Sequence, residues 1–362
     1  KGENAIIKKA FFFLICMLPI IFTGCWDSLE INERIFVTTI GVDLNKDPNL
    51  QGRFEITYSY PDIGSLGESP TQKDVNTTIT TTSETPFDSS RQITTRVSNP
   101  FFFKHLKVIV IGEDLFKKPE LIKELFDGLN REYKINRKVS IIVAEGSAKD
   151  VVNTKVKELA IAGGHLNSML NNNTVAQRYT KQTFSQIIKD HHISNASFAP
   201  RAVPKTNEFK LSGAAVLKNF KIVGWICERE NRALALVRDH LKSEVFNVKY
   251  NNTTVDYVIS QHKSKKSIDY DEDKLKVNIN IFLEGYIEQY KLGEKLDTFN
   301  SKFIRDMETN IEKVVKDEVG SLVQKLQREY NTDILGIGEY LYKFEPNIWD
   351  EVKEDILLFQ EC

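Results

Sequence analysis

The chain reads Leu-Lys-Val-Ile-Val-Ile-Gly at residues 106–112 and Val-Ser-Ile-Ile-Val-Ala at residues 139–144. Continuous apolar runs of this length are typical of strands that are covered on both faces. Between them, Pro119 can open a helix with one apolar face. The side chains of that face are Leu121, Ile122, Leu125, Phe126 and Leu129. A strand, a helix and a second strand in this order favour a parallel pair with a right-handed crossover, so the sequence predicts an α/β unit.

The segments on either side extend this unit. Residues 35–43 are β-branched and aromatic, and residues 53–60 alternate with a period of two, so the pair predicts an antiparallel hairpin. Residues 61–75 are rich in Gly, Ser, Pro and Asp and predict a surface loop. The tract of residues 77–83 is almost entirely Thr and predicts an exposed strand without a chemical role. Residues 148–160 are predicted to be helical.

Asn, Ser and Pro gather in two further segments, residues 171–174 and residues 194–207, which are predicted loops. We place the main domain boundary in the second of them. This gives an N-terminal domain of residues 25–205, with a mixed sheet and helices, and a C-terminal domain of residues 206–362.

The C-terminal domain is predicted to hold a sheet and one long helix. Apolar runs within residues 213–224 flank Lys218 and Asn219 and indicate a hairpin, and residues 229–238 indicate a short helix. Alternation at residues 275–283 predicts a half-buried strand. A helix from about residue 297 to 330 should lie on that strand, with a coiled coil as the alternative. Its apolar stripe consists of Phe303, Met307, Ile311, Val315, Val319, Leu322, Leu326 and Tyr330.

Composition limits the classes of function. The 362 residues include 49 Lys and Arg against 50 Asp and Glu, and this balance argues against a nucleic-acid surface. A hydrophobic content of 41% with 27% charged residues is ordinary for a folded protein of two or three domains. The sequence contains no Gly-x-Gly-x-x-Gly, P-loop, His-Glu-x-x-His or Gly-x-Ser-x-Gly motif. We therefore predict no catalytic residue, no metal site and no cofactor, and a protein that is not an enzyme.

Three histidines were weighed as functional residues. His191 and His192 are adjacent, so their side chains diverge on a helix or a strand, and a metal pair is disfavoured against solvated polar residues. His105 precedes a buried strand and is expected to hydrogen-bond in a turn rather than to act as a base.

Three other features are interpreted as structural. Cys227 lies in an apolar run and is predicted to be a small buried residue, since the four cysteines have no zinc or disulfide spacing. Asp333 with Gly336 and Gly338 is interpreted as a helix end that turns into a strand, rather than as a cation site. The basic stretch of residues 262–266 predicts a solvated loop, with contact to anionic lipid as the alternative.

Residues 1–24 have the organisation of an export signal. Lys8 and Lys9 form a basic region, and an apolar stretch follows at residues 10–22. This stretch is shorter than the roughly 18 to 20 residues that a membrane-spanning helix needs. A short buried helix is the alternative, but the basic and apolar regions stand in export order.

The segment that follows resembles the bacterial lipobox, with small residues at Thr23 and Gly24 immediately before Cys25. Phe22 stands where the motif usually has Leu. The resemblance implies cleavage between Gly24 and Cys25 and lipidation of the Cys25 thiol, with acyl chains such as palmitate. Two or more acyl chains hold a protein durably at a membrane, so Cys25 would fix the folded body to the outer face.

Eight short segments carry a recognisable combined pattern. They are Gly24-Cys-Trp-Asp27, Glu30-Ile-Asn32, Thr39-Ile-Gly-Val-Asp43, His105 to Glu113, Leu211 to Val216, Ile222 to Trp225, Asp333 to Gly338 and Pro346 to Trp349. In their order and spacing, which cover most of the chain from Cys25 to Trp349, they resemble the C subunits of spore germinant receptors, the Ger(x)C family.

The resemblance implies an elongated, multi-domain α/β lipoprotein with mixed sheets packed against helices. It also implies a place in the inner spore membrane, where the protein assembles with the A subunit and the permease-like B subunit of the receptor to trigger germination by nutrients. Direct binding of a small-molecule germinant is left open. Members of the family continue past the Trp349 region into a final strand, so the C-terminal sheet here is expected to lack an edge.

Two alternatives come from other classes of protein. A lipid-anchored solute-binding protein of a transporter would have two similar α/β lobes around a ligand cleft. An exported cell-wall hydrolase would need a convergent pair of acids or a metal site, and the sequence shows neither.

Overall fold

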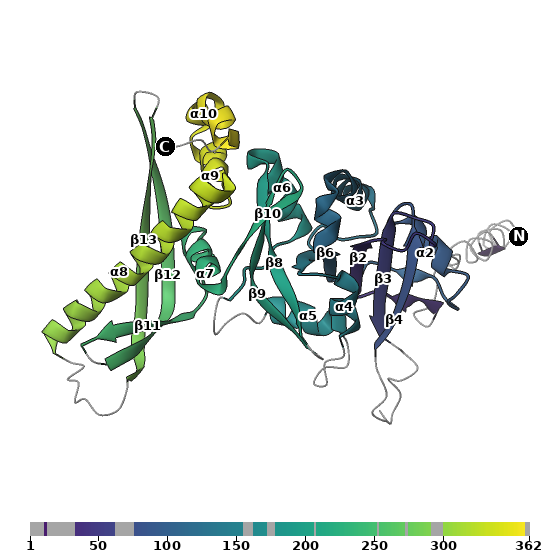
Figure 1. Cartoon of the computed structure of the whole chain (residues 1–362), viewed down its shortest axis with the longest axis horizontal. Coiled ribbons are helices and arrows are strands. Elements are labelled where there is room, and N and C mark those ends of the chain that lie inside the picture. Colours follow the sequence, from purple (N-terminus) through teal and green to yellow (C-terminus); the bar gives the residue numbers. More distant parts are fainter. Residues whose placement is uncertain are drawn as a thin grey trace, which may run out of the picture.

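The computed structural model places two β-sheets at opposite ends of an elongated α/β molecule (Figure 1). One end contains an eight-stranded sheet with helices on both faces, and the other contains a three-stranded sheet crossed by a long helix. The residues that the structure describes are 11–12, 33–61, 76–154, 162–171, 178–205, 208–251, 253–271, 274–290 and 300–358. Cys25, the predicted leader apart from residues 11–12, and most of the loop predicted at residues 61–75 lie outside these ranges.

The eight-stranded sheet has the order β10-β9-β8-β7-β6-β2-β3-β4. Its central strands β2, β6, β7 and β8 are parallel, and antiparallel pairs flank them on both sides. The predicted hairpin β2–β3 and the predicted parallel pair β6–β7 are confirmed. The strands of this end are β1 (Ile35–Phe36), β2 (Thr39–Leu44), β3 (Phe54–Pro61), β4 (Asn76–Ser83), β5 (Phe101–Phe102), β6 (Val108–Gly112), β7 (Ser140–Ala144), β8 (Ala196–Lys205), β9 (Glu208–Lys218) and β10 (Lys221–Ile226).

Helices cover both faces of this sheet because its central strands are apolar on both sides. α3 and α6 bury their apolar stripes against one face, and α4 and α5 cover the other. The predicted apolar face of α3 is buried at all five positions. The helices of this end are α2 (Asp88–Ile93), the 3₁₀ helix η3 (Glu113–Lys117), α3 (Pro119–Arg131), α4 (Ala148–Asn153), α5 (Ala162–Asn171) and α6 (Phe184–Ser194).

The loop predicted at residues 194–207 is wrong, because β8 runs through it despite Pro200 and Pro204. Proline removes a ladder donor, which a central strand does not normally tolerate. Here β7 pairs with β8 at only two positions, and the pairing with β9 shifts register just after Pro200. The strand therefore accommodates both prolines. The predicted boundary after residue 205 falls between two paired strands of one sheet, and the division of the chain there stays a prediction.

The three-stranded sheet has the order β11-β12-β13, and its long hairpin β12–β13 confirms the strand predicted at residues 275–283. The turn predicted around Lys218 and Asn219 is also confirmed, since β9 and β10 form an antiparallel hairpin. The elements of this end are α7 (Glu228–Val237), β11 (Glu244–Tyr250), β12 (Thr253–Asp271), β13 (Lys274–Tyr290), α8 (Ser301–Lys325), the π-helical turn η4 (Leu326–Tyr330), α9 (Ile337–Phe344) and α10 (Pro346–Leu358).

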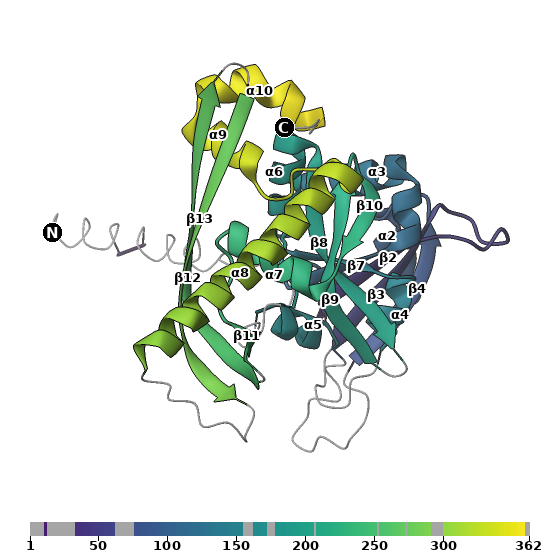
Figure 2. The same cartoon turned by 60° about the vertical axis from the view of Figure 1, so that its left-hand side comes forward.

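The long helix α8 crosses the face of this sheet, with α7 between the two sheets (Figure 2). Its first half buries Phe303, Met307 and Ile311 against β11 and β12. Its end buries Leu322 in a second cluster that also contains Phe198 of β8. The predicted packing of one apolar stripe on the sheet is therefore confirmed, and the same stripe reaches the neighbouring eight-stranded sheet.

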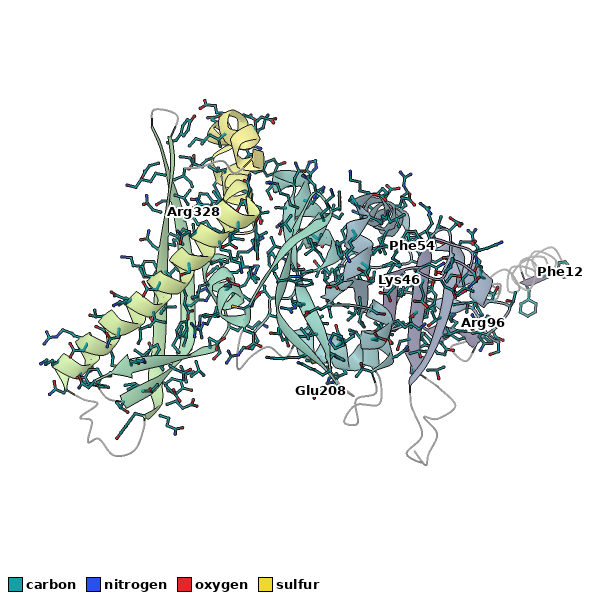
Figure 3. All side chains as sticks on the ribbon, in the orientation of Figure 1. Phe12, Lys46, Phe54, Arg96, Glu208 and Arg328 are labelled. Carbon is teal, nitrogen blue, oxygen red and sulfur yellow. The ribbon has the colours of Figure 1, made fainter. Side chains whose placement is uncertain are left out.

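Edges of the eight-stranded sheet are capped by side chains from other elements. At the β4 edge, Arg96 donates to the backbone oxygen of Thr80 at 2.9 Å (Figure 3). At the β10 edge, Lys325 and the Tyr330 hydroxyl both donate to the backbone oxygen of Trp225. Such caps satisfy edge carbonyls that would otherwise pair with another chain.

Gly213 and Gly320 provide a matched test of this fold. Gly213 of β9 has φ of 67°, and a Cβ atom there would lie 1.9 Å from the backbone oxygen of Ile226. Gly320 of α8 has open space around the same position. We expect Gly213→Ala to destabilise the protein by about 3 kcal/mol or more, because strain and a backbone clash add.

The control Gly320→Ala should stabilise the protein by about 0.5–1 kcal/mol through helix propensity. Urea unfolding followed by circular dichroism measures both changes. Equal stability of the Gly213→Ala variant and the wild type would contradict the β9–β10 geometry.

Candidate functional site

The residues considered in the sequence are spread over the molecule. Cys25 lies outside the described residues. None of the described helices is long and apolar enough to cross a bilayer. His191 of α6 stacks on Phe220 at 3.8 Å between ring centroids, and His105 packs against Phe36 and Phe102. Within the described ranges, no three His, Cys, Asp or Glu side chains converge in a geometry that could hold a metal ion.

Three structural interpretations are corrected. Cys227 is exposed, because β10 ends at Ile226 and Cys227 is the N-cap residue of α7. The stretch of residues 262–266 is part of β12 and not a loop. Its alternating pattern turns Lys266 inward, where its ammonium donates to the backbone oxygen of Val237 at 2.8 Å. Burial lowers the pKa of that ammonium.

The third correction concerns Asp333, which precedes a helix and not a strand. Its carboxylate accepts hydrogen bonds from the backbone N–H groups of Gly336, Ile337 and Gly338 at 2.7–3.2 Å. These groups open α9 and have no partner inside the helix. Gly336 takes φ of 77°, which glycine adopts without strain. Asp333 therefore initiates α9.

In an open α/β sheet a ligand usually binds beyond the carboxyl ends of the strands, at the point where the strand order reverses. Here the order reverses between β2, which continues to β3 on one side, and β6, which continues to β7 on the other. In this protein a carboxylate of the chain itself occupies the position. Asp43 of β2 is 7% exposed and accepts from the backbone N–H groups of Ala148 and Lys149, each at 2.8 Å.

The surroundings of Asp43 are built to fit it. Ser147 donates a further hydrogen bond to its carboxylate at 3.2 Å. A Cβ atom on Gly112 would lie 2.0 Å from Asp43 Oδ1, so glycine is required at the end of β6. Burial raises the pKa of Asp43, and the hydrogen bonds from Ala148 and Lys149 oppose that rise without cancelling it. Asp43 thus fills the anion position at the start of α4.

The apolar core on the α3 face of the sheet contains a cavity of about 20 Å³. Ile56, Tyr58 and Leu125 are among its lining residues. This volume accommodates about one water molecule. It is too small for an amino acid or a sugar, so this cavity is not a nutrient site.

A buried charge cluster lies where α6, α7 and α9 meet. Its centre is Arg238, whose side chain is 8% exposed. The guanidinium donates to the backbone oxygen of Ile334 at 2.8 Å, to Asp190 at 3.2 Å and to Glu339 at 3.3 Å. Lys189 also pairs with Glu339, at 2.8 Å. One arginine therefore joins a helix of the eight-stranded sheet to the C-terminal helices.

The pKa values of the two carboxylates that pair with Arg238 are shifted in opposite directions. Burial raises the pKa of Asp190, although Arg238 and Lys189 act against the rise. Burial acts in the same direction on Glu339, but hydrogen bonds from Lys189 and Lys343 outweigh it and lower the pKa of Glu339 to about 2. Glu339 is therefore ionised at neutral pH and supplies a negative charge to the cluster.

A second buried ion pair holds the three-stranded end together. Arg232 of α7 donates to Glu318 of α8 at 3.0 Å, and the two side chains are 11% and 10% exposed. The same guanidinium lies 4.0 Å from the ring centroid of Phe246 on β11. Paired and hydrogen-bonded charges of this kind fix the relative position of elements, and removing one partner is costly. The arrangement positions α7, α8 and β11 rather than forming an open reactive centre.

Sequence reasoning missed Asp43, Asp190, Arg238 and Glu339. Asp43 carried a signal, since an acidic residue at the end of a buried strand points to the helix starts at the same sheet edge. Arg238 follows directly on the apolar helix α7, which places it at a buried helix end. Asp190 and Glu339 carried no signal, because only the packing of α6 against α9 brings them to one guanidinium.

Comparisons with known proteins agree with this architecture. Residues 27–203 match the family model for the spore germination protein N-terminal domain. Residues 212–357 match the model described as spore germination B3/GerAC like, C-terminal. The chain is thus a spore germination protein by class. It belongs to the GerAC family, whose two domains it carries in order.

Individual relatives are distant but extend over nearly the whole chain. Spore germination protein YndF of Bacillus subtilis (strain 168) is 27% identical over 94% of this chain and 90% of its own length. Spore germination protein B3 of the same organism is 21% identical over 95% of this chain and 90% of its own length. The crystal structure of the GerBC protein superposes with a TM-score of 0.55 at 19% identity, covering 88% of this chain and 93% of that one. This likeness confirms the multi-domain fold.

Acid titration tests the Arg238 cluster through Glu339. Its folded-state pKa of about 2 lies below the ordinary 4.5, so the folded protein binds this proton less tightly than the unfolded chain. The stabilisation is complete above pH 4.5 and is lost as the pH falls toward 2. Because water screens part of the interaction, we expect Glu339→Gln to cost about 1–2 kcal/mol at pH 7 and little at pH 2.

Urea unfolding at several pH values measures this difference. Asp190 contributes with the opposite sign, since its raised pKa favours the folded state at low pH. The Glu339 charge is one cause of that rise, so Glu339→Gln also reduces the contribution of Asp190. The control Glu351→Gln alters an exposed carboxylate of α10 and should leave the profile unchanged. A constant difference between Glu339→Gln and the wild type across this pH range would contradict the assignment.

Proposed function

We propose that this protein is a lipid-anchored, non-enzymatic subunit of a nutrient germinant receptor. The observation that carries the proposal is the position of the family match, which begins at residue 27, two residues after the cysteine of the lipobox-like segment. An export signal, a lipidated Cys25 and a GerAC body then follow one another without a spacer. Such a protein resides on the outer face of the cytoplasmic membrane, which becomes the inner membrane of the spore.

The length of the connection fixes how far the body can lie from the bilayer. Ile35, where β1 begins, is the tenth residue after Cys25. Even a fully extended connection spans at most about 35 Å. A diacylated Cys25 would hold the protein durably at the membrane surface. The eight-stranded end, which contains β1, is therefore the end held near the lipid.

The role that the architecture supports is assembly and relay of a signal between subunits. The cluster around Arg238 and the shared apolar core connect the two ends by continuous packing, and a relay between them requires such a connection. In this role the protein assembles with the A and B subunits of the receptor. Its relatives include spore germination proteins A3 and B3 of Bacillus subtilis (strain 168), which are named for a role in germination.

Replacement of the anchor residue tests this proposal. We expect Cys25→Ala to move the protein from the membrane fraction to the soluble fraction and to reduce nutrient-triggered germination at least tenfold, because the acyl chains supply the membrane affinity. Fractionation and germination assays measure the two effects. Cys227→Ser is the matched control, since it removes an exposed thiol and should change neither.

Mass spectrometry of the mature N-terminal peptide gives an independent measurement. A mature chain that begins at a diacylated Cys25 supports the proposal. An unmodified Cys25 thiol, or full membrane association and nutrient response of Cys25→Ala, would refute it. Purification from spore membranes without A and B subunits would refute the receptor role alone.

A further inference from the structure

A group of aromatic and cationic side chains surrounds the small parallel sheet formed by β1 and β5. Phe36 of β1 and Phe102 of β5 meet edge to face at 5.5 Å between ring centroids. The His105 ring packs against both of them, at 5.2 and 5.7 Å. Together with three cations, these side chains form what we call the N-terminal aromatic surface. It consists of Arg34, Phe36, Phe102, Lys104, His105 and Lys107.

The strand alternation divides three successive phenylalanines between the core and this surface. Phe101 and Phe103 pack inward beside Tyr58, at 4.8 and 6.1 Å between ring centroids. All three rings are partly buried, as is Phe36, but Phe102 is not part of the apolar core that Phe101 and Phe103 pack against. Part of the Phe36 and Phe102 ring area therefore stays accessible to the solvent, beside the exposed side chains of Lys104 and Lys107. Core packing does not account for the position of Phe102.

The charge of the surface is positive. Three cations, Arg34, Lys104 and Lys107, stand against one carboxylate, Glu33, in residues 33–36 and 99–107. The Arg34 guanidinium lies 4.9 Å from the Phe102 ring centroid, and Lys104 and Lys107 are exposed. Basic side chains beside phenylalanine rings are a composition typical of protein segments that bind at the surface of an anionic bilayer.

The position of the surface brings it to a membrane, and this step rests on the proposed function. Because β1 begins ten residues after Cys25, a lipid at Cys25 keeps the surface within about 35 Å of the bilayer. The tether makes contact with lipid effectively intramolecular, so even weak surface affinity leads to docking.

We propose that the N-terminal aromatic surface docks on anionic phospholipid and fixes the orientation of the body on the membrane. Phe36, Phe102 and His105 lie at the headgroup level, and the three cations face the lipid phosphates. Each cation near an anionic bilayer strengthens binding about fivefold. The elongated body then projects away from the membrane, with β13 remote from the lipid because the two sheets lie at opposite ends (Figure 1).

Fluorescence quenching in vesicles tests the docking. The lipidated full chain carries Cys227→Ser and Cys362→Ser, and a fluorophore is attached through Lys104→Cys or, as the control, through Phe282→Cys on β13. Phe282 is 56% exposed and belongs to the opposite end. In vesicles that contain phosphatidylglycerol and doxyl-labelled lipid, we expect quenching at residue 104 to exceed that at residue 282 at least threefold.

Two variants and one control, all labelled at residue 104, test which side chains make the contact with lipid. Phe102→Ala should lower the quenching at least twofold, whereas Phe344→Ala, which removes an exposed phenylalanine from α9, should not change it. Lys107→Gln alters only an exposed side chain and should also lower the quenching. Vesicles of neutral phosphatidylcholine should give less quenching than anionic ones.

The outcomes separate docking from anchoring. A chain that floats with vesicles but is quenched equally at both labels would overturn the docking and leave the anchor intact. A chain that does not float would contradict the anchor itself. Shielding of residue 104 only when the A and B subunits are present would assign the surface to a protein partner and overturn the lipid proposal.

Discussion

The architecture depends on one apolar core that belongs to both ends of the molecule. Phe198 of β8 and Leu322 of α8 are both fully buried in it, together with side chains of α7 and α9. Neither the eight-stranded sheet nor the C-terminal helices can bury these faces alone. The core therefore couples two family domains into one body, and the Arg238 cluster fixes how α6 and α9 meet beside it. The Arg238 guanidinium also lies 5.4 Å from the Phe198 ring centroid, so the charge cluster borders directly on this apolar core.

Contacts within the protein also account for the charged side chains of the candidate sites. At the switch point of the sheet, Asp43 takes the place that a bound anion takes in many α/β proteins. At the junction, lysine, arginine and carboxylate side chains neutralise one another. Polar groups that could meet a ligand are instead used to join elements. This use of charge fits the proposed role of a receptor subunit that holds its shape between a membrane and its partners.

Sequence periodicity predicted the elements whose environment is local. The parallel pair β6–β7, the hairpins and the stripe of α8 follow from apolar spacing that each segment carries itself. The errors arose where composition and environment disagree. Pro200 and Pro204 indicated a loop, yet a short pairing partner and a register shift allow a strand. Cys227 lies in an apolar run but comes one residue after the strand ends. Asp333 was correctly assigned a structural role, but only the packing of α9 shows that it starts a helix.

By itself, the sequence determined the α/β class, the order of most strands and helices, and the resemblance to the GerAC family, because periodicity and ordered motifs are properties of the chain. Only the tertiary structure decided that β8 to β10 continue the first sheet, that Asp43 fills the switch point, and that Asp190 and Glu339 meet at Arg238. These contacts join residues that are about 50 to 150 positions apart, and their energies depend on burial and distance. Neither burial nor distance can be predicted from a local sequence pattern, since both arise only when the elements pack.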